Sequence, residues 1–163
     1  MIKQLLLGVV ALCASLYVND YATIKYNNVS FKELHREVQR EIECLAINIY
    51  RESGFEPISG QIAVAFVTIN RMLSPEFPKS VCSVVYQRDR RVCQFSWTCM
   101  TSLSKINRER YEYIKELAKH VYLNHHKIDD PSLGATFYHA DYVFPRWKLE
   151  KTTKIGRHIF YKM

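Results

Sequence analysis

Glu52 occupies the position in this sequence that best suits acid–base chemistry. It stands at the end of an expected amphipathic helix, directly before Ser53 and Gly54, and a strongly apolar segment begins at Ile58. A carboxyl group with apolar surroundings on one side keeps its proton more readily, because burial disfavours the charged carboxylate. Such a group can protonate the leaving oxygen of a glycosidic bond. Taken alone, however, a glutamate at a helix end is more often a solvated charge.

Two further segments combine flat apolar side chains with hydrogen-bonding groups, namely residues 94–97 and Tyr138-His139. Sugar rings present apolar C–H faces and hydroxyl edges, so this mixture suits a groove that binds a glycan. We therefore expect a groove lined by Gln94, Phe95, Ser96, Trp97, Tyr138 and His139. Trp97 equally suits a core position, and we expect Trp147 to pack in the protein rather than to contact a ligand.

Two helices are expected around Glu52. From Glu33 to Tyr50, apolar residues recur at three- and four-residue steps, which predicts an amphipathic helix that ends around Glu52-Ser53-Gly54. Gly54 is expected to close it by adopting a positive φ. A second helix, from Pro57 to about Met72, has almost no polar face, which predicts a central place in the core.

The rest of the chain predicts a mostly helical α+β domain with a small β-ribbon. Ser80 is expected to cap a short helix that runs through Tyr86, and Ser104 a longer helix from Lys105 to Leu123. The predicted core face of this longer helix consists of Ile106, Tyr113, Leu117 and Val121. Residues 135–139 and 158–161 predict two strands, joined by a polar loop that contains proline.

The N-terminal segment is typical of an export signal. Lys3 precedes an uncharged apolar run from Leu5 to Val18, which stops at Asn19-Asp20 and is short for a membrane span. An uncleaved signal-anchor and a buried helix of the domain remain alternatives. We therefore divide the chain into residues 1–19 as export signal or signal-anchor, 20–32 as connector and 33–163 as catalytic domain.

Charge and cysteine content agree with an exported protein. The net charge of +7 favours polyanionic partners, among them nucleic acid, anionic lipid and cell-wall polymers. Outside the apolar segment, which contains Cys13, the chain has four cysteines, and an even number fits two disulfides in an oxidising compartment. Three pairings are open, and four free thiols would be expected in a reducing cytosol. These four residues are Cys44, Cys82, Cys93 and Cys99.

Several blocks of residues, in order, resemble the SleB/CwlJ-type cell-wall hydrolases. The first runs from Ile49 to Ala65 and contains the Tyr-x-Glu and Gly-Gln elements, followed by Asn70-Arg71. The others are Phe77-Pro78, Val85-Tyr86-Gln87, and residues 93–97, 134–139 and 155–161. The resemblance spans roughly residues 40–162. One departure is Phe55, which separates the usual Gly-Glu pair and leaves a role for Glu56 open.

The resemblance implies a lysozyme-like domain that cuts the MurNAc–GlcNAc backbone of peptidoglycan. Glu52 would act first as acid and then as base, and Ser53 and Gln61 would orient it or bind sugar. A lytic transglycosylase, which forms 1,6-anhydro-MurNAc ends, needs one carboxylate, whereas a muramidase usually needs two. The candidates for a second carboxylate are Glu76, Asp89 and Asp141. The N-terminal segment resembles the signal-anchors of some phage endolysins, which predicts transient or permanent membrane attachment.

Other ligands are less well supported by the sequence. No cofactor is expected, and no metal, because the histidines and cysteines lack the short spacings of zinc sites. No nucleic-acid-binding motif accompanies the basic turn of Arg88–Arg91, so nucleic acid is not expected as a partner. Two rival classes remain: a wall-binding module without catalysis, and a cytosolic domain that binds nucleic acid through its charge.

Overall fold

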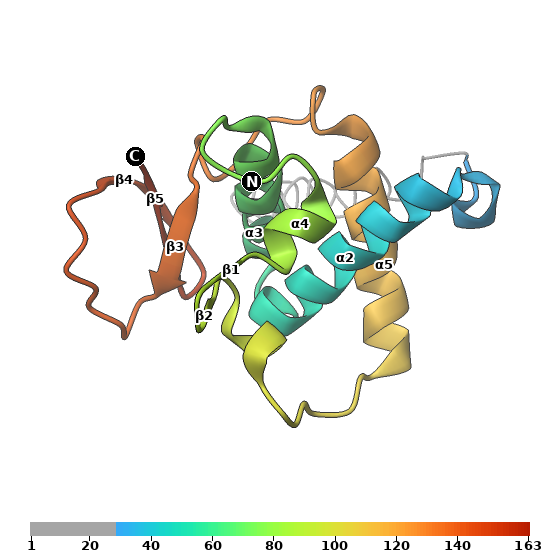
Figure 1. Cartoon of the computed structure of the whole chain (residues 1–163). Helices are drawn as coiled ribbons and strands as arrows, with labels where there is room; N and C mark the ends of the chain where they lie inside the picture. Colours follow the sequence, from blue (N-terminus) through green and yellow to red (C-terminus); the bar gives the residue numbers. More distant parts are fainter. Residues whose placement is uncertain (1–28) are drawn as a thin grey trace, which may run out of the picture.

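The structure, a computed structural model, describes residues 29–163. The helical elements are η1 (Phe31–Glu33), α2 (Arg36–Ser53), α3 (Ile58–Leu73), α4 (Val81–Val85), η2 (Ser96–Cys99) and α5 (Arg108–Asn124). The strands are β1 (Arg88–Asp89), β2 (Val92–Cys93), β3 (Phe137–Ala140), β4 (Glu150–Ile155) and β5 (His158–Lys162). Figure 1 shows the helices grouped together, with the β3–β5 sheet on one side. This mostly helical α+β architecture with a small sheet confirms the predicted fold class.

The predicted export segment, residues 1–19, and residues 20–28 of the predicted connector lie outside the described residues. Among residues 29–163, no helix is both long enough and apolar enough to cross a membrane.

Helices α2 and α3 form the centre of the core, as their sequence patterns predict. Ile42, Leu45 and Ile49 lie three and four residues apart on α2, and all three are fully buried. This face packs against α3, α4 and α5. Each such side chain contributes about 1.5–3 kcal/mol when it is removed from water. Helix α3 is buried on nearly all sides, because α2 and α4 cover one face and the sheet covers the other.

Helix α5 begins later than predicted. Its N-cap is Asn107, whose side-chain oxygen accepts a hydrogen bond from the backbone N–H of Arg110. The prediction that Ser104 caps this helix is wrong. Ser104 lies in the preceding loop, where its carbonyl and hydroxyl oxygens accept hydrogen bonds from Nη1 of Arg51.

The predicted core face of α5 is correct at Leu117 and Val121 but wrong at its N-terminal end. Ile106 precedes the helix and is 44% exposed, and Tyr113 is 36% exposed. Ile114 is fully buried instead. Once the helix starts at Arg108, the buried stripe passes through position 114, three residues before Leu117.

The sheet contains three antiparallel strands in the order β3-β5-β4 rather than the two-stranded ribbon that was predicted. β4 lies in the stretch predicted as a loop. Its sequence, Glu-Lys-Thr-Thr-Lys-Ile, forms a polar edge strand with little apolar alternation. One face of the sheet packs on α3, where Phe160 and Ala135 contact Ala63, Val64 and Val67.

Both predicted disulfides are present. Cys44–Cys82 joins α2 to α4 inside the helical core, and Cys93–Cys99 joins β2 to η2. The first closes a long segment of the chain and the second a short loop, with sequence separations of 38 and 6 residues. The structure thereby selects one of the three pairings that the sequence leaves open.

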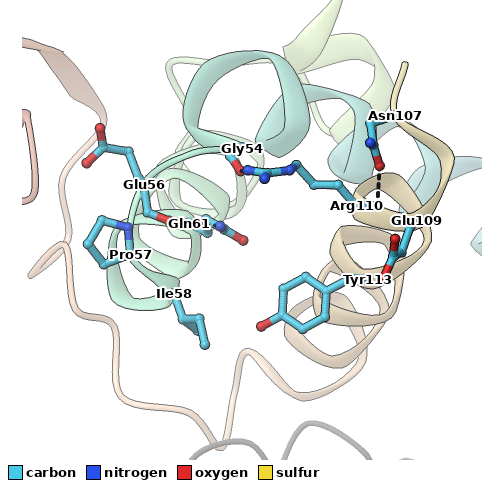
Figure 2. Close-up of a pocket in the computed structure, with 9 residues that line it drawn as sticks. All are labelled: Gly54, Glu56, Pro57, Ile58, Gln61, Asn107, Glu109, Arg110 and Tyr113. Atoms are coloured by element: carbon cyan, nitrogen blue, oxygen red, sulfur yellow. Dashed lines mark hydrogen bonds between the residues drawn. The ribbon is translucent and has the colours of Figure 1, made fainter.

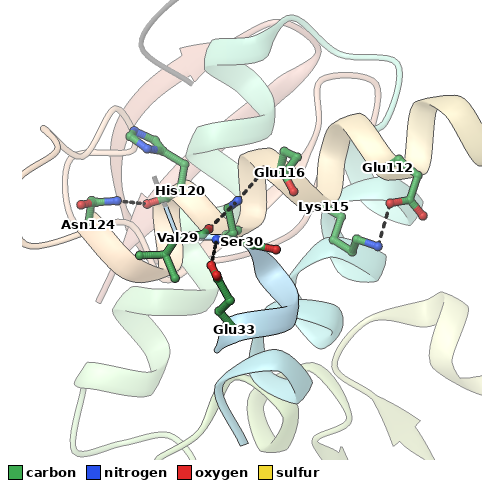
Figure 3. Close-up of polar contacts among 9 residues, drawn as sticks. Val29, Ser30, Glu33, Glu112, Lys115, Glu116, His120 and Asn124 are labelled. Atoms are coloured by element: carbon green, nitrogen blue, oxygen red, sulfur yellow. Dashed lines mark hydrogen bonds and ion pairs between the residues drawn. The ribbon is translucent and has the colours of Figure 1, made fainter. Parts of the chain in front are cut away.

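A buried lysine holds the beginning of the described chain against α5, and Figure 3 shows Val29 and Ser30 beside that helix. Lys119 is 5% exposed and donates a hydrogen bond to the carbonyl oxygen of Val29, at 3.2 Å. It also pairs with Glu116 at 2.6 Å, which compensates its buried charge. Next to Val29, the backbone N–H of Ser30 donates to Glu33 at 2.8 Å. Residues 29–32 of the predicted connector therefore pack on the domain.

Candidate active site

Glu52 lies in the last turn of α2, immediately before a tight turn at Gly54. The predicted positive φ at Gly54 is wrong, because its φ is −59°. The turn excludes side chains for a different reason: a Cβ on Gly54 would lie 2.5 Å from the carbonyl oxygen of Tyr50. This close approach allows the chain to leave α2 and enter α3 within a few residues.

Tyr138 is the direct partner of Glu52. Its hydroxyl group donates a hydrogen bond to Oε2 of Glu52, at 2.9 Å, although the two residues are 86 positions apart. The last polar residues of α3 fix the chain that enters β3. Asn70 donates to the carbonyl oxygen of Ala135 at 3.0 Å, and Nε of Arg71 donates to the carbonyl oxygen of Thr136 at 2.6 Å. These bonds give the Asn-Arg pair at the end of α3 a definite role, which is to position Tyr138.

Arg71 is a buried cation beside Glu52. Its side chain is 3% exposed, and its guanidinium group lies 5.3–5.4 Å from the ring centroids of Phe77, Phe95 and Phe137. When the amide of Gln94 is oriented with its oxygen toward the guanidinium, it accepts hydrogen bonds from Nη1 and Nη2 at 3.0 and 3.2 Å. Burial lowers the pKa of Arg71 to about 10, so the group remains charged at neutral pH.

The surroundings of Glu52 favour its protonated form. Burial is the largest effect and raises the pKa of Glu52 above its ordinary value of 4.5. The Tyr138 hydrogen bond and the charge of Arg71 act in the opposite direction and offset part of this effect. Burial and the neighbouring carboxylate raise the pKa of Tyr138 well above 10, so this phenol stays a hydrogen-bond donor. Glu52 can therefore hold a proton for donation and still be stabilised as an anion.

Glu52 opens into a cleft of about 320 Å³, which we call the Glu52 cleft. One wall consists of Cys93, Gln94, Phe95 and Ser96, from β2 and the start of η2. The other consists of Phe137, Tyr138 and Trp147, and Arg71 completes the lining. Among these lining residues Glu52 is the only carboxylate. The cleft thus joins one protonatable acid to aromatic surfaces and hydrogen-bonding groups.

The structure brings together five of the predicted site residues, namely Glu52, Gln94, Phe95, Ser96 and Tyr138. Sequence reasoning did not assign Arg71, Phe137 and Trp147 to the site. Arg71 had a recognisable signal, because a charged residue at the end of a helix without a polar face must be buried with a partner. Nothing in the local sequence distinguishes Phe137 from an ordinary strand residue.

The two tryptophans lie opposite to their predicted positions. Trp97 is 8% exposed and packs in the core, where its indole N–H donates to Oδ1 of Asn48 at 3.0 Å. It does not line the Glu52 cleft. Trp147, predicted to pack in the protein, is 43% exposed and lines that cleft. Its ring also contacts Phe137 and Tyr161 edge-on.

Three other predicted residues lie outside the Glu52 cleft. Ser53 is buried and its hydroxyl donates back to the carbonyl oxygen of Ile49 at 3.1 Å. Gln61 is buried on α3 and borders a different pocket. His139 is half-buried behind the cleft, where it stacks on Tyr161 and hydrogen-bonds its hydroxyl group at 3.0 Å. His139 also contacts the edge of Trp147, so it supports a cleft residue instead of lining the cleft.

None of the three candidates for a second carboxylate lines the Glu52 cleft. Glu76 and Asp89 are exposed on loop and hairpin segments, and Asp141 pairs with Lys154 at 2.9 Å. Glu56 has a structural partner: its Oε2 accepts a hydrogen bond from the backbone N–H of Arg157 at 2.9 Å. Within residues 29–163, no group of three or more His, Cys, Asp or Glu residues is arranged to hold a metal ion.

Comparison with known proteins identifies the class to which this fold and site belong. The family model described as Cell Wall Hydrolase matches residues 55–161, and the chain belongs to this family. The matched segment begins three residues after Glu52. The chain is also similar to the solved catalytic domain of the Bacillus cereus SleB protein, with 30% identity and a TM-score of 0.56, over 76% of this chain and 91% of that one.

Further relatives agree with this assignment. The catalytic domain of the germination-specific lytic transglycosylase SleB from Bacillus anthracis is 28% identical with a TM-score of 0.56, and covers 83% of this chain. The match covers 98% of that domain. Spore cortex-lytic enzymes of Halalkalibacterium halodurans and Bacillus cereus are 31% and 32% identical over 74% and 76% of this chain. The chain spans 34% and 45% of those two curated relatives.

Proposed function

We propose that this protein cleaves the MurNAc–GlcNAc backbone of peptidoglycan as a lytic transglycosylase, with Glu52 acting as acid and then as base. The observation that carries the proposal is the Glu52 cleft, in which a single carboxylate with a raised pKa faces aromatic and hydrogen-bonding side chains. The similarity to a domain described as a lytic transglycosylase supports the same reaction.

The first step requires a protonated Glu52. Because Tyr138 donates its hydroxyl proton to Oε2, the acidic proton of Glu52 resides on Oε1. Glu52 transfers this proton to the glycosidic oxygen, and the bond between that oxygen and C1 of MurNAc breaks. The GlcNAc part leaves as an alcohol, and positive charge develops at C1. Burial of Glu52 favours this step because it disfavours the ionised ground state.

The second step uses the carboxylate that remains. Ionised Glu52 removes the proton from the C6 hydroxyl group of the same MurNAc, and O6 forms a bond to C1. The product is a 1,6-anhydro sugar, no water is consumed, and Glu52 regains its proton. Arg71 and the Tyr138 hydroxyl group stabilise the transient carboxylate, since both favour the ionised form.

The walls of the Glu52 cleft suit the sugar rings of this substrate. Trp147 and Phe137 offer flat apolar surfaces to C–H faces, and Gln94 and Ser96 offer polar groups to hydroxyl and acetamido groups. We expect Gln94 to bind substrate through its N–H₂ group, because its oxygen faces Arg71.

The proposed place of action is outside the cytoplasm. Two disulfides, the net charge of +7 and the apolar segment at residues 1–19 all suit an exported protein that meets an anionic wall. We propose that this segment directs export and holds the protein at the membrane before release or cleavage.

The experiment compares the wild-type protein with Glu52→Gln on purified peptidoglycan sacculi. Mass spectrometry of the soluble fragments distinguishes 1,6-anhydro ends from reducing MurNAc ends. Anhydro fragments from the wild type alone are expected. Reducing ends would make the protein a muramidase with a further catalytic carboxylate. If neither protein releases glycan fragments, the domain is a wall-binding module without catalysis.

A further inference from the structure

The Glu52 cleft is one of three neighbouring hollows around the α2–α3 corner. A second hollow, which we call the corner hollow, is lined by Glu52 together with Gly54, Glu56, Asn107 and residues beside them. Gly54, Glu56 and Asn107 also line a third hollow, the α3–α5 pocket. Since each hollow shares lining residues with the next, the surface provides a path from Glu52 around the corner to α5.

The α3–α5 pocket has a volume of about 560 Å³, which exceeds that of the Glu52 cleft. Figure 2 shows the Gln61 amide pointing from α3 toward the space in front of Tyr113 and Arg110 on α5. Gln61 is 6% exposed and its Nε2 donates to the carbonyl oxygen of Glu56 at 2.9 Å. Its Oε1 has no hydrogen-bond partner among residues 29–163. A buried unpaired acceptor that borders a pocket is suited to a ligand with an N–H or O–H donor.

The edge of this pocket carries both signs of charge. Glu109 is exposed in the first turn of α5, and Arg110 follows it. Arg110 donates to the carbonyl oxygen of Gly54 at 2.9 Å, and its guanidinium group lies 4.0 Å from the centroid of the Phe55 ring. These contacts hold the cation beside the pocket opening.

The lining differs from that of the Glu52 cleft in the way that a peptide site differs from a sugar site. Tyr113 is the only aromatic residue among those that line the α3–α5 pocket, whereas four aromatic residues line the Glu52 cleft. The pocket instead combines an internal acceptor with one guanidinium group and two carboxylates, of which Glu56 already accepts a hydrogen bond from the backbone N–H of Arg157 and Glu109 is exposed. This set matches a chain of amides that has a carboxylate and an ammonium group.

We propose that the α3–α5 pocket binds the peptide that is attached to the muramic acid of peptidoglycan, while the glycan lies in the Glu52 cleft. The inference rests on the proposed function. A peptide N–H donates to Oε1 of Gln61, a peptide carboxylate pairs with Arg110, and an ammonium group, where the peptide has one, pairs with Glu109. A peptide of four extended residues reaches about 13 Å, and the corner hollow, which shares lining residues with both sites, offers it a route from the sugar. The pocket thereby selects glycan strands that retain their peptides.

The test measures kcat/KM on peptidoglycan with intact peptides and on glycan strands from which an amidase has removed them. The variants are Gln61→Met, which removes the acceptor, and Glu109→Ala. The matched control is Glu37→Ala, because Glu37 is also an exposed acid in the first turn of a helix but lies on α2. We expect the ratio of kcat/KM on the two substrates to fall about tenfold in Gln61→Met and severalfold in Glu109→Ala. It should not change in Glu37→Ala.

The proposal would be overturned if Gln61→Met and Glu109→Ala both left the ratio of kcat/KM on the two substrates unchanged. This holds if kcat/KM stays at the wild-type value on both substrates, and also if it falls by the same factor on both. A binding arm separates this failure from failure of the proposed function. The free tetrapeptide is titrated into the wild-type protein, and the side-chain amide resonance of Gln61 is followed by NMR. A saturable shift, weakened by Glu109→Ala, supports the pocket even if no glycan is cleaved. Absence of a shift contradicts it even if Glu52 proves catalytic.

Discussion

Two glutamates on either side of the α2–α3 corner have the same side chain but different surroundings. Glu52 faces the aromatic cleft, where burial raises its pKa and one phenol donates to it. Glu56 receives the backbone N–H of Arg157 and so holds the turn between β4 and β5. That turn favours glycine at position 156, because its φ is +55° and Oε2 of Glu56 lies where a Cβ would be. Under the proposed function, the surroundings of each carboxylate, more than its place in a motif, separate the catalytic acid from the structural one.

The sharpest test of this comparison is the matched pair Glu52→Gln and Glu56→Gln. Glu52→Gln should lower the rate of glycan cleavage by about 10²–10⁴-fold, because general acid–base catalysis contributes that much. Glu56→Gln should retain most of the rate but lower the free energy of unfolding by about 1 kcal/mol, the contribution of one hydrogen bond. Cleavage assays and denaturant unfolding measure the two effects. A larger loss of rate in Glu56→Gln than in Glu52→Gln would reverse the assignment.

The two disulfides allow the same kind of comparison, because one lies in the helical core and the other in the wall of the Glu52 cleft. Removing Cys44–Cys82 by double alanine substitution should cost about 4 kcal/mol of stability, because the bond closes a segment of 38 residues. Removing Cys93–Cys99, which closes only 6 residues, should cost about 2 kcal/mol. The second bond lies beside Gln94, Phe95 and Ser96, so its loss should raise KM as well.

Denaturant unfolding and cleavage kinetics on the two double variants check this prediction. Removing Cys44–Cys82 should cause the larger loss of stability and little change in KM. Removing Cys93–Cys99 should cause the smaller loss of stability and a clear rise in KM. Equal effects on KM would show that the wall keeps its shape without the Cys93–Cys99 bond.

Tyr138→Phe tests how the environment of Glu52 sets its pKa. The Tyr138 hydrogen bond lowers the pKa of Glu52, so its removal should raise that pKa further. Since the acid step needs protonated Glu52, activity falls as pH rises through this pKa, and the alkaline limb of the pH–rate profile should move to higher pH. The maximal rate should fall about tenfold or less.

The matched control for this prediction is Tyr161→Phe on the neighbouring strand. The hydroxyl group of Tyr161 hydrogen-bonds His139 and not Glu52, so its loss should leave the alkaline limb in place. A shift of the Tyr138→Phe limb to lower pH would contradict the role assigned to the hydrogen bond.

The smallest expected effect concerns stability against pH. The pKa of Glu52 is raised in the folded state, so the folded protein binds more protons than the unfolded chain as pH rises above about 4.5. The contribution of Glu52 to stability is therefore fully present below that pH and is lost as pH rises through the folded-state pKa. The Glu52→Gln variant has no titrating group at this position. The free energy of unfolding of the variant minus that of the wild type should therefore increase with pH. Denaturant unfolding over a range of pH measures the difference, and a difference that decreases with pH would contradict a raised pKa.

The sequence by itself predicted the parts of the molecule that depend on local patterns. The periodic apolar residues of α2 and the uniformly apolar sequence of α3 specify two buried helices, because a helix turns its side chains outward in a fixed order. The same patterns placed Glu52 at the α2–α3 corner, and the even number of cysteines predicted two disulfides. The ordered motif blocks identified the cell-wall hydrolase family, which the comparisons confirm.

Only the tertiary structure decided which side chains meet. Trp97 and Trp147 lie in a short 3-10 helix and an irregular segment, where no periodicity indicates which side is buried. The pairing of Tyr138 with Glu52 depends on how α3 holds the chain before β3, across 86 residues. Local sequence specifies the exposed and buried sides of an element, whereas packing of the whole chain determines which element covers each side.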